Sequence, residues 1–354
     1  MAEEQRKDGI RFVAAGDVFL SGKVAYKDGT SQEVISYKPE AVFQDVAPIF
    51  RNTDVVFCNL ESALADRGTP PRDRIGCFMS RPENVKLLKE AKIDVVSFAN
   101  NHSMDFGPEA MFQTLSLLDQ HGIAHAGAGA NITEARKPAF VKKKGTTFAF
   151  LAYATNINTP GWFSARPKRA GLAYIRLHPY FAPPHVTKED LRAMELDIKE
   201  AKEKADFVIV SCHWGVSQGG TYSVAPHQSA IGQTAISAGA ELVLGHHQHA
   251  YQGVELYQGK MICHGLGNFI FDTLDAPFFP ETVLFHCTFQ KGGIGEAWLQ
   301  PIIQDDHAHP HPLPPEDENS RRILSQLKEL SSELGTKIKI EGGNAHIVLG
   351  KSKR

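Results

Sequence analysis

The sequence lacks three features that would each indicate a particular class of protein. Its 354 residues include no apolar stretch close to the roughly 20 residues that a membrane-spanning helix needs. Lys and Arg total 38 against 40 for Asp and Glu, so there is no excess positive charge of the kind that binds nucleic acid. The five cysteines are odd in number and show no Cys-x-x-Cys spacing, which argues against a disulfide framework and a thiolate zinc site. We therefore expect no membrane span in this chain and no nucleic-acid partner.

The composition is otherwise ordinary for a globular enzyme, with 42% hydrophobic and 22% charged residues. The first residues, MAEEQRKDGIRF, are charged and have no apolar core, so they do not resemble a signal peptide. This predicts a cytoplasmic location for the chain as written, and an extracytoplasmic one if the N-terminus has been trimmed. The 16 histidines stand out, and their placement indicates the chemistry.

Short β-type runs alternate with helical patterns along most of the chain, which predicts an α/β fold built in layers. The expected strands are 11–15, 54–58, 93–98, 146–152, 207–212, 241–244, 260–263, 282–290 and 296–303, with a strand-like run at 338–349. The expected helices are 82–91, 108–121, 188–205, 226–238 and 320–334. Several strand runs, such as FVIV, are apolar at consecutive positions, which favours strands buried on both faces.

The last part of the chain is separated from the rest by a loop rich in Asp, His and Pro. We expect a main domain at 1–300, this loop at 301–318, and a helix and strand at 319–354. A tail of about 35 residues buries too little surface to fold alone, so it should pack on the main domain.

Five of the expected strands end in polar residues at their carboxyl side. In open α/β sheets, ligands bind outside the carboxyl ends of the strands. This edge therefore collects carboxylates, carboxamides and imidazoles that are far apart in the sequence. The residues concerned are Asp17, Asn59, Glu61, Asn100, Asn101, His102, Asp105, His213, His246, His247 and His249.

These residue types suit a metal site. Neutral imidazoles together with carboxylate oxygens favour divalent ions such as zinc, manganese or iron. The two imidazoles of the His-Gln-His run at 247–249 reach one site if the turn after Gly245 bends sharply. A divalent ion held there would activate bound water and polarise an ester or amide oxygen. His102, which follows a predicted ligand, is expected to donate a proton to a leaving group.

A second group of histidines lies in the polar loop. His307, His309 and His311 alternate with other residues, Pro among them, between Asp305 and Glu318. For this loop a solvated linker is favoured over a second metal site.

Six ordered segments resemble the CapA family, which is named for capsule and poly-γ-glutamate synthesis proteins and is related to the calcineurin-like metallophosphoesterases. The segments are GDVFL, NLESAL, SFANNHSMDFG, HAGAGANITEARKPA, HWGVS and LVLGHHQHAYQGVELYQGKMICHGLGNFIFD. The similarity runs from about Arg11 to Leu349, which is nearly the whole chain. It implies a four-layer α-β-β-α sandwich with the active site at one edge of the β-layers.

The resemblance also implies one or two divalent metal ions, Mn, Zn, Fe or Mg, and assigns the residues that bind them. The implied ligands of one ion are Asp17, Glu61 and His249, and those of the other are Glu61, Asn101, His213 and His247. Glu61 would bridge the two ions and His102 would act as the acid. Within the same motifs, the residues expected to contact substrate are Asn59, Asn100, Trp214 and Asn268.

Two positions depart from the phosphoesterase pattern. That pattern has Asp-x-His in the first block, whereas this sequence reads Asp17-Val18-Phe19, so one metal position loses an imidazole. Glu61 replaces the usual Asp, which lengthens the bridging arm by one methylene. Both departures are typical of the CapA branch, and they predict a one-metal site or one strong and one weak site.

The favoured function is a metal-dependent hydrolase or transferase acting on an ester, phosphoester or γ-glutamyl amide bond of a small molecule, a peptide or an acidic polymer. A second hypothesis is a non-catalytic subunit that binds polymer or other capsule-synthesis proteins. A third is a peptide epimerase in which Asp17 and His247 act as acid and base on opposite faces of a Cα atom. Bound metal would favour the first hypothesis, and deuterium incorporation without bond cleavage would identify the third.

Overall fold

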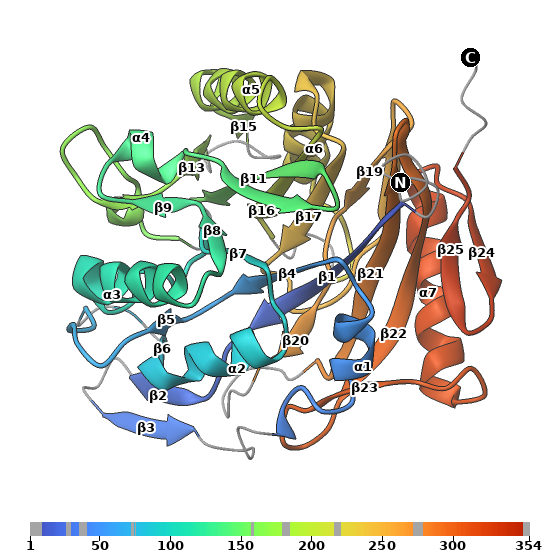
Figure 1. Cartoon of the computed structure of the whole chain (residues 1–354), viewed down its shortest axis with the longest axis horizontal. Helices are drawn as coiled ribbons and strands as arrows, with labels where there is room; N and C mark the ends of the chain where they lie inside the picture. Colours follow the sequence, from blue (N-terminus) through green and yellow to red (C-terminus); the bar gives the residue numbers. More distant parts are fainter. Residues whose placement is uncertain are drawn as a thin grey trace.

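The computed structural model describes residues 9–25, 30–34, 41–71, 74, 76–156, 159–178, 185–215, 221–271 and 279–349. Within these residues, two large β-sheets form the centre of the molecule and helices cover their outer sides (Figure 1). Among the helices of this described part, none has both the length and the apolar character needed to cross a membrane. The compartment in which the chain works stays a prediction.

The first sheet has the strand order β24-β25-β22-β21-β1-β4-β7-β8, with β20 beside β1 and β23 beside β22. Neighbours among β1, β4, β7 and β8 are parallel, so their carboxyl ends lie at one edge of the sheet. The strands are β1 (Ile10–Val18), β4 (Val55–Leu60), β7 (Val95–Ser97), β8 (Ala124–Ala126), β20 (Asn268–Ile270), β21 (Glu281–Gln290), β22 (Gly293–Gln304), β23 (Pro310–Pro312), β24 (Ile338–Glu341) and β25 (Asn344–Ile347).

The second sheet has the order β10-β11-β16-β17-β19-β18, with β13 beside β11. Its central strands β11, β16, β17 and β19 are also parallel. The strands are β10 (Ala139–Lys143), β11 (Thr146–Thr155), β13 (Tyr174–Ile175), β16 (Phe207–His213), β17 (Leu242–His246), β18 (Val254–Tyr257) and β19 (Lys260–Cys263).

Helices and small sheets complete the described structure. The α-helices are α1 (Ala47–Arg51), α2 (Val85–Glu90), α3 (Gly107–Gln120), α4 (Ile132–Ala135), α5 (Lys188–Lys202), α6 (Pro226–Ala238) and α7 (Glu318–Glu333), and the short 3-10 turns are Pro82–Asn84 and Gly161–Phe163. The small sheets contain β2 (Gly22–Ala25), β3 (Ser31–Val34), β5 (Ala63–Leu64) and β6 (Cys77–Ser80), then β9 (Ala128–Gly129) with β12 (Gly171–Leu172), and β14 (Leu177–His178) with β15 (His185–Val186).

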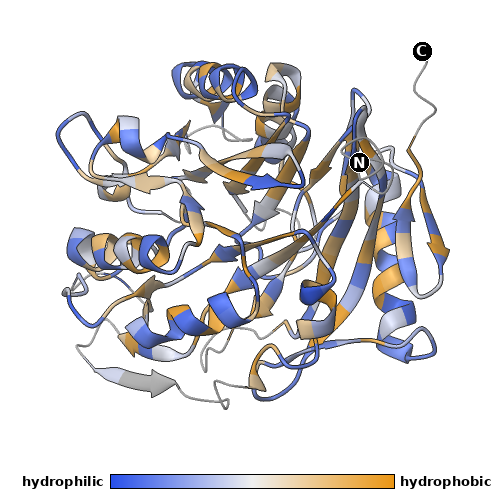
Figure 2. Ribbon diagram, viewed as in Figure 1, coloured by the Kyte–Doolittle hydropathy of each residue, from blue (hydrophilic) through white to orange (hydrophobic). Residues whose placement is uncertain are grey.

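Hydrophobic clusters fill the space between neighbouring layers. Between the two sheets, the Phe150 ring of the second sheet packs against the rings of Phe12 and Phe57 of the first, with centroid separations of 6.3 and 6.0 Å. A second cluster joins the outer face of the first sheet to α1, α2 and α3, and a third joins the outer face of the second sheet to α5 and α6. Figure 2 shows hydrophobic residues along the strands and mostly hydrophilic residues on α5. The layers thus form the α-β-β-α sandwich that the sequence predicted, and the fold class is confirmed.

Most expected elements are present, with shifted ends. The strand expected at 54–58 runs on to Leu60 in β4, and that expected at 207–212 runs on to His213 in β16. The strand-like run at 338–349 is a hairpin of β24 and β25, which turns at Gly342 and Gly343 with positive φ angles of 56° and 76°. Glycine adopts such angles without strain. The Pro-rich loop also contains a short strand, because β23 pairs with β22.

The C-terminal helix α7 packs on the main body of the protein. Ile323 and Leu327, which lie on the apolar stripe expected from the sequence, are fully buried in the cluster between the sheets. The Asp317 side chain caps the helix by accepting hydrogen bonds from the backbone N–H groups of Asn319 and Ser320. The domain limits at 300 and 318 stay predictions.

A buried histidine on the first sheet predicts loss of stability in acid. The ring of His286 stacks on Trp298 at 4.9 Å and hydrogen-bonds to Gln300 Oε1 at 2.9 Å. Burial lowers the pKa of His286 to about 4, although the bond to Gln300 opposes this. The unfolded chain takes up this proton near pH 6.5 and the folded chain does not, so the free energy of unfolding falls as pH drops between these values. At pH 5 this group should account for about 2 kcal/mol.

Urea unfolding of the wild type and of His286→Gln at pH 7.5 and pH 5 tests this expectation. The glutamine variant should lose less free energy of unfolding than the wild type over this pH change. A His307→Gln variant, altered at an exposed loop residue, should follow the wild type. Equal pH dependence in all three proteins would contradict the assignment.

Candidate functional site

The polar residues predicted at the strand ends lie together at one edge of the two sheets. β1 and β4 place Asp17 opposite Asn59, and β16 and β17 place His213 opposite His246. The first sheet therefore supplies carboxylates and carboxamides, and the second supplies imidazoles. The site forms where the carboxyl ends of the two sheets meet.

Three possible ligand atoms surround Nε2 of His213. Asn101 Oδ1 lies 2.6 Å from it, His247 Nδ1 lies 2.9 Å from it, and Glu61 Oε1 lies 3.5 Å from it. A ring nitrogen carries at most one proton, so hydrogen bonding to His213 satisfies only one of these neighbours. Ligand atoms of Glu61, His213 and His247 all lie within 4.8 Å of one another, which is compatible with one shared cation.

A second group of possible ligands shares Glu61. Ligand atoms of Asp17, Glu61 and His249 also lie within 4.8 Å of one another. His249 Nδ1 is 3.7 Å from Asp17 Oδ2 and 2.7 Å from Asn268 Oδ1. His246, which the resemblance did not assign, places its Nδ1 3.2 Å from Asp17 Oδ1. Glu61 thus belongs to both groups, as a bridging ligand would, and the bridging role itself stays a prediction.

Two asparagines hold the carboxylates in place. Asn59 Nδ2 donates to Asp17 Oδ1 at 2.9 Å and to Glu61 Oε2 at 3.4 Å. Asn100 Nδ2 in turn donates to Asn59 Oδ1 at 3.3 Å and to Leu60 O at 2.8 Å. Asn59 thus fixes the orientation of the two carboxylates, and Asn100 fixes the orientation of Asn59.

The backbone after β17 makes the sharp turn that the His-Gln-His run requires. His247 and His249 have positive φ angles of 97° and 56°, which are strained for residues with side chains and cluster at functional sites. The turn follows Gly245, where an added Cβ would lie 2.0 Å from His264 O and 2.6 Å from Trp214 Nε1. Only glycine fits there, and the strained turn brings the side chains of His247 and His249 to the site.

Burial dominates the pKa values of the groups at this site. Burial raises the pKa of Glu61 well above its ordinary value, and the negative charge of Asp17 adds to this. Burial lowers the pKa of His213 well below its usual range and that of His247 to about 3. For Asp17, burial acts to raise the pKa, but nearby imidazoles, His246 first, hold it below its ordinary value. Burial thus favours the neutral form of His213 and His247, which is the form that binds metal.

This donor set fits a divalent metal ion. Glu61 Oε1 is buried and has no hydrogen-bond partner among the residues that the structure describes. A buried polar atom without a partner is costly, and a bound cation would offset that cost. The missing imidazole of the first block has a structural explanation, because Phe19 packs in the core and stacks on Phe78 at 5.0 Å. The residues that would hold the metal are Asp17, Glu61, Asn101, His213, His247 and His249.

His102 lies beside this group and is held by its own partners. Its Nδ1 is 2.6 Å from Asp105 Oδ2, and its ring stacks on Phe78 at 4.0 Å. Burial lowers the pKa of His102, although Asp105 acts in the opposite direction. Arg74 holds Asp105 with an Nε–Oδ1 distance of 3.1 Å and also donates to the carbonyl of Asn101. The imidazole is thus oriented by an ion-paired carboxylate.

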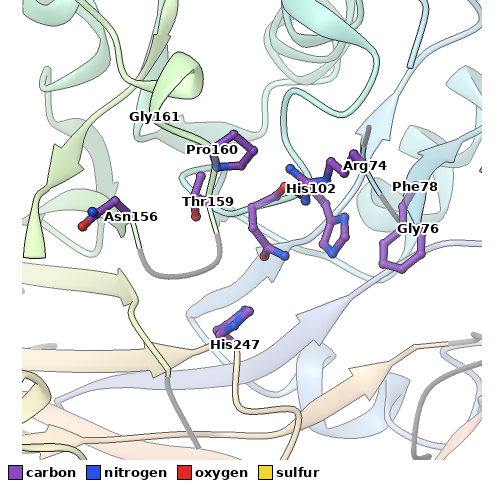
Figure 3. Close-up of a pocket in the computed structure, with 10 residues that line it drawn as sticks. Arg74, Gly76, Phe78, His102, Asn156, Thr159, Pro160, Gly161 and His247 are labelled. Carbon is purple, nitrogen blue, oxygen red and sulfur yellow. Dashed lines mark hydrogen bonds between the residues drawn. The ribbon is translucent and has the colours of Figure 1, made fainter. Parts of the chain in front are cut away.

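A cavity of about 630 Å³ opens over His102 and His247 (Figure 3). Arg74 and Phe78 line one side of it, and Asn156, Thr159, Pro160 and Gly161 line the other. The cavity thus gives a substrate access to the groups described above.

The residues predicted to contact substrate lie behind the ligands rather than in this cavity. Asn59 and Asn100 are fully buried, and Asn268 accepts a hydrogen bond through Oδ1 from His249 Nδ1. Trp214 is fully buried, and its indole N–H donates to His264 O at 3.0 Å. This placement leaves Trp214 no exposed surface, so it does not support a role in substrate binding; it supports a role in packing the turn after Gly245.

Sequence reasoning missed Arg74 and Phe78 altogether and gave Asp105 no role. Arg74 lies just before β6 and Phe78 lies within it. The sequence around them contains no motif that indicates a functional site, and only the folded structure shows that they are near it. Asp105 carried one signal, because it follows His102 by three residues in the third polar block.

The family model for the bacterial capsule synthesis protein PGA_cap matches residues 11–273. The PGA biosynthesis protein CapA of Bacillus subtilis is 30% identical over 322 residues, which cover 86% of this chain and 74% of that protein. The capsule biosynthesis protein CapA of Bacillus anthracis is 26% identical over 274 residues, which cover 76% of this chain and 62% of that protein. These matches confirm the family that the sequence motifs indicated.

Solved structures show more distant similarity. A calcineurin-like phosphoesterase from Bacillus subtilis is 9% identical with a TM-score of 0.42, and the match covers 84% of this chain and 86% of that one. A hypothetical protein from Thermus thermophilus is 18% identical with a TM-score of 0.44, and the match covers 86% of this chain and 96% of that one.

Proposed function

The chain belongs to the bacterial capsule synthesis protein family PGA_cap, and from this premise we propose that it is a metal-dependent hydrolase or transferase of poly-γ-glutamate or capsule synthesis. Its substrate bond would be an ester, a phosphoester or a γ-glutamyl amide. The observation that carries the proposal is the convergence of ligand atoms on His213 Nε2, together with the buried Glu61 Oε1, which has no hydrogen-bond partner in the described part of the chain.

A bound divalent ion supplies a nucleophilic water and polarises the oxygen of the bond to be broken. The protein's own contribution is orientation and proton transfer. Asn59 fixes the carboxylates of Asp17 and Glu61, and Asp105 fixes His102 through Nδ1. His102 then exchanges a proton with the leaving group through Nε2, in a cavity that also exposes His247.

Arg74 supports an acidic substrate. Its Nε and one Nη bind Asp105 and the Asn101 carbonyl, whereas its Nη1 is buried without a hydrogen-bond partner among the described residues. Because Arg74 lines the cavity, the positive charge of its guanidinium would favour a ligand that carries a carboxylate or a phosphate. Small acidic molecules, peptides and acidic polymers share this chemistry, and the predicted capsule-synthesis partners stay a prediction.

Metal content and turnover test the proposed function together. After incubation with Mn²⁺ or Zn²⁺ and removal of loosely held ions, His213→Ala should hold about one metal equivalent less than the wild type by elemental analysis. Its turnover of phosphodiester and γ-glutamyl anilide substrates should fall by more than about 100-fold, which exceeds the loss typical of residues that only orient ligands.

His125→Ala is the matched control, because His125 pairs with Asp119 at 3.1 Å and belongs to none of the ligand groups. It should retain the metal and the activity. Equal metal content in the wild type and a folded His213→Ala variant would overturn the proposal. Solvent deuterium incorporation without cleavage would then favour the epimerase hypothesis, and unaltered partner binding would favour the non-catalytic subunit.

A further inference from the structure

We propose a second divalent-metal site, suited to Zn²⁺, at the turn between β22 and β23. Its ligands are Asp305, His309 and His311, whose ligand atoms all lie within 4.8 Å of one another. None of these residues comes from the elements that form the first group. The sequence favoured a solvated linker here, whereas the structure places three possible zinc ligands, one Asp and two His, close together.

The distances match the geometry of a zinc site. Asp305 Oδ2 lies 3.1 Å from His311 Nε2 and 3.4 Å from His309 Nδ1. Ligands at the usual zinc distances around a tetrahedral ion are separated by about 3.3 Å. The three atoms therefore need little movement to bind one ion, and the local backbone already holds them there.

The backbone around Asp305 explains why its Oδ2 faces the imidazoles. Its other oxygen, Oδ1, accepts hydrogen bonds from the backbone N–H groups of His307 at 2.8 Å and of His309 at 2.9 Å. The turn is completed by Ala308, which is buried and has a positive φ of 57°. β23 then pairs with β22, so His311 stands opposite Ile303. The position of the carboxylate is thus fixed by the main chain.

A second carboxylate orients His311 from outside the group. Asp45 Oδ2 lies 2.5 Å from His311 Nδ1, on the ring nitrogen that faces away from Asp305. Metal-binding histidines typically donate their other N–H to a carboxylate in this way, which fixes the tautomer and raises the basicity of the ligand. Asp45 lies just before α1, so a bound ion would tie this distant segment to the β22–β23 turn.

The exposure of the three ligands leaves one coordination position open to solvent. The side chains of Asp305, His309 and His311 are 34%, 20% and 37% exposed. Solvent can therefore reach the ion and supply the fourth ligand of a tetrahedral zinc. The competing explanation is an ion cluster without metal, in which a protonated His311 is bound between Asp45 and Asp305.

Zinc stoichiometry of the full chain separates these explanations. The protein is saturated with Zn²⁺, freed of loose ions and measured by elemental analysis as the wild type, His309→Ala and His307→Ala. We expect His309→Ala to hold about one equivalent less than the wild type and His307→Ala to hold as much as the wild type. Cobalt substitution should give tetrahedral absorption bands that weaken in His309→Ala and not in His307→Ala.

Asp45→Asn keeps all three ligands and tests the site even if His309→Ala fails to fold. We expect about 10- to 100-fold weaker Zn²⁺ binding at this site in competition with a chelator. Equal stoichiometry in the wild type and His309→Ala, or unchanged affinity in Asp45→Asn, would overturn the proposal in favour of the ion cluster. The number of metal equivalents lost in His213→Ala measures the first site separately. The absence of one metal site can therefore be distinguished from the absence of the other.

Discussion

Replacing His102 with glutamine should lower turnover by about 10²- to 10⁴-fold, the range measured for loss of a general acid or base. The metal content should not change, because His102 belongs to neither ligand group. Its Nδ1 is 2.6 Å from Asp105 and its ring lines the cavity, so the imidazole is oriented for proton exchange with a bound substrate. Steady-state kinetics and elemental analysis on the same preparations would check both parts of this expectation.

Asp105→Asn separates orientation from proton transfer. The amide oxygen can still accept a hydrogen bond from the imidazole but carries no negative charge to stabilise its protonated form. Turnover should therefore fall less than in His102→Gln, and the pH dependence of kcat should shift. His125→Gln should behave as the wild type. If His102→Gln instead loses its metal, the residue is a ligand; if it keeps full activity, the proton comes from elsewhere.

Glu61→Gln should weaken metal binding by more than about 100-fold and abolish activity, since Glu61 belongs to both ligand groups. In metal-free protein the same change should raise the free energy of unfolding by about 1 kcal/mol, because burial and the negative charge of Asp17 disfavour a charged carboxylate at this position. An amide at this position can also donate to the neighbouring Asp17. Urea unfolding in the presence of a chelator measures the stability, and elemental analysis measures the metal.

Glu61→Asp is the matched control. It keeps the carboxylate and restores the residue that the phosphoesterase pattern has, with an arm shorter by one methylene. It should retain more metal than Glu61→Gln and gain no stability when metal-free. A Glu61→Gln variant that keeps its metal, or that is less stable than the wild type without it, would contradict the bridging role.

Much of the site could be predicted because parallel strands bring their carboxyl ends to one edge. Asp17, Glu61 and His213 each follow a strongly apolar run, so their neighbourhood follows from the alternation of strands and helices alone. The sequence makes the convergence of His247 and His249 conditional on a sharp turn after Gly245, and the structure contains that turn. These inferences depend on local sequence and on one general rule of topology.

The rest depended on the three-dimensional path of loops, which no local pattern encodes. Arg74 reaches Asp105 from a loop that precedes β6, and Asp45 reaches His311 across 266 positions of sequence. The side chain of Trp214, which is next to a predicted ligand, is buried and donates a hydrogen bond to His264 O. Adjacency in a strand motif does not decide on which side of the sheet a side chain lies, because neighbouring residues point to opposite faces.

The division of the ligands between the two sheets has a consequence for the motions of the protein. Asp17, Glu61 and Asn101 belong to one sheet and His213, His247 and His249 to the other. Neither sheet alone supplies all the ligands of either group. An ion bound there would therefore cross-link the two sheets at the carboxyl ends of their strands. We expect hydrogen exchange at the carboxyl ends of β4 and β16 to slow when metal binds, while exchange at the opposite ends stays unchanged. The proposed metal site would then also hold the two sheets of the sandwich together.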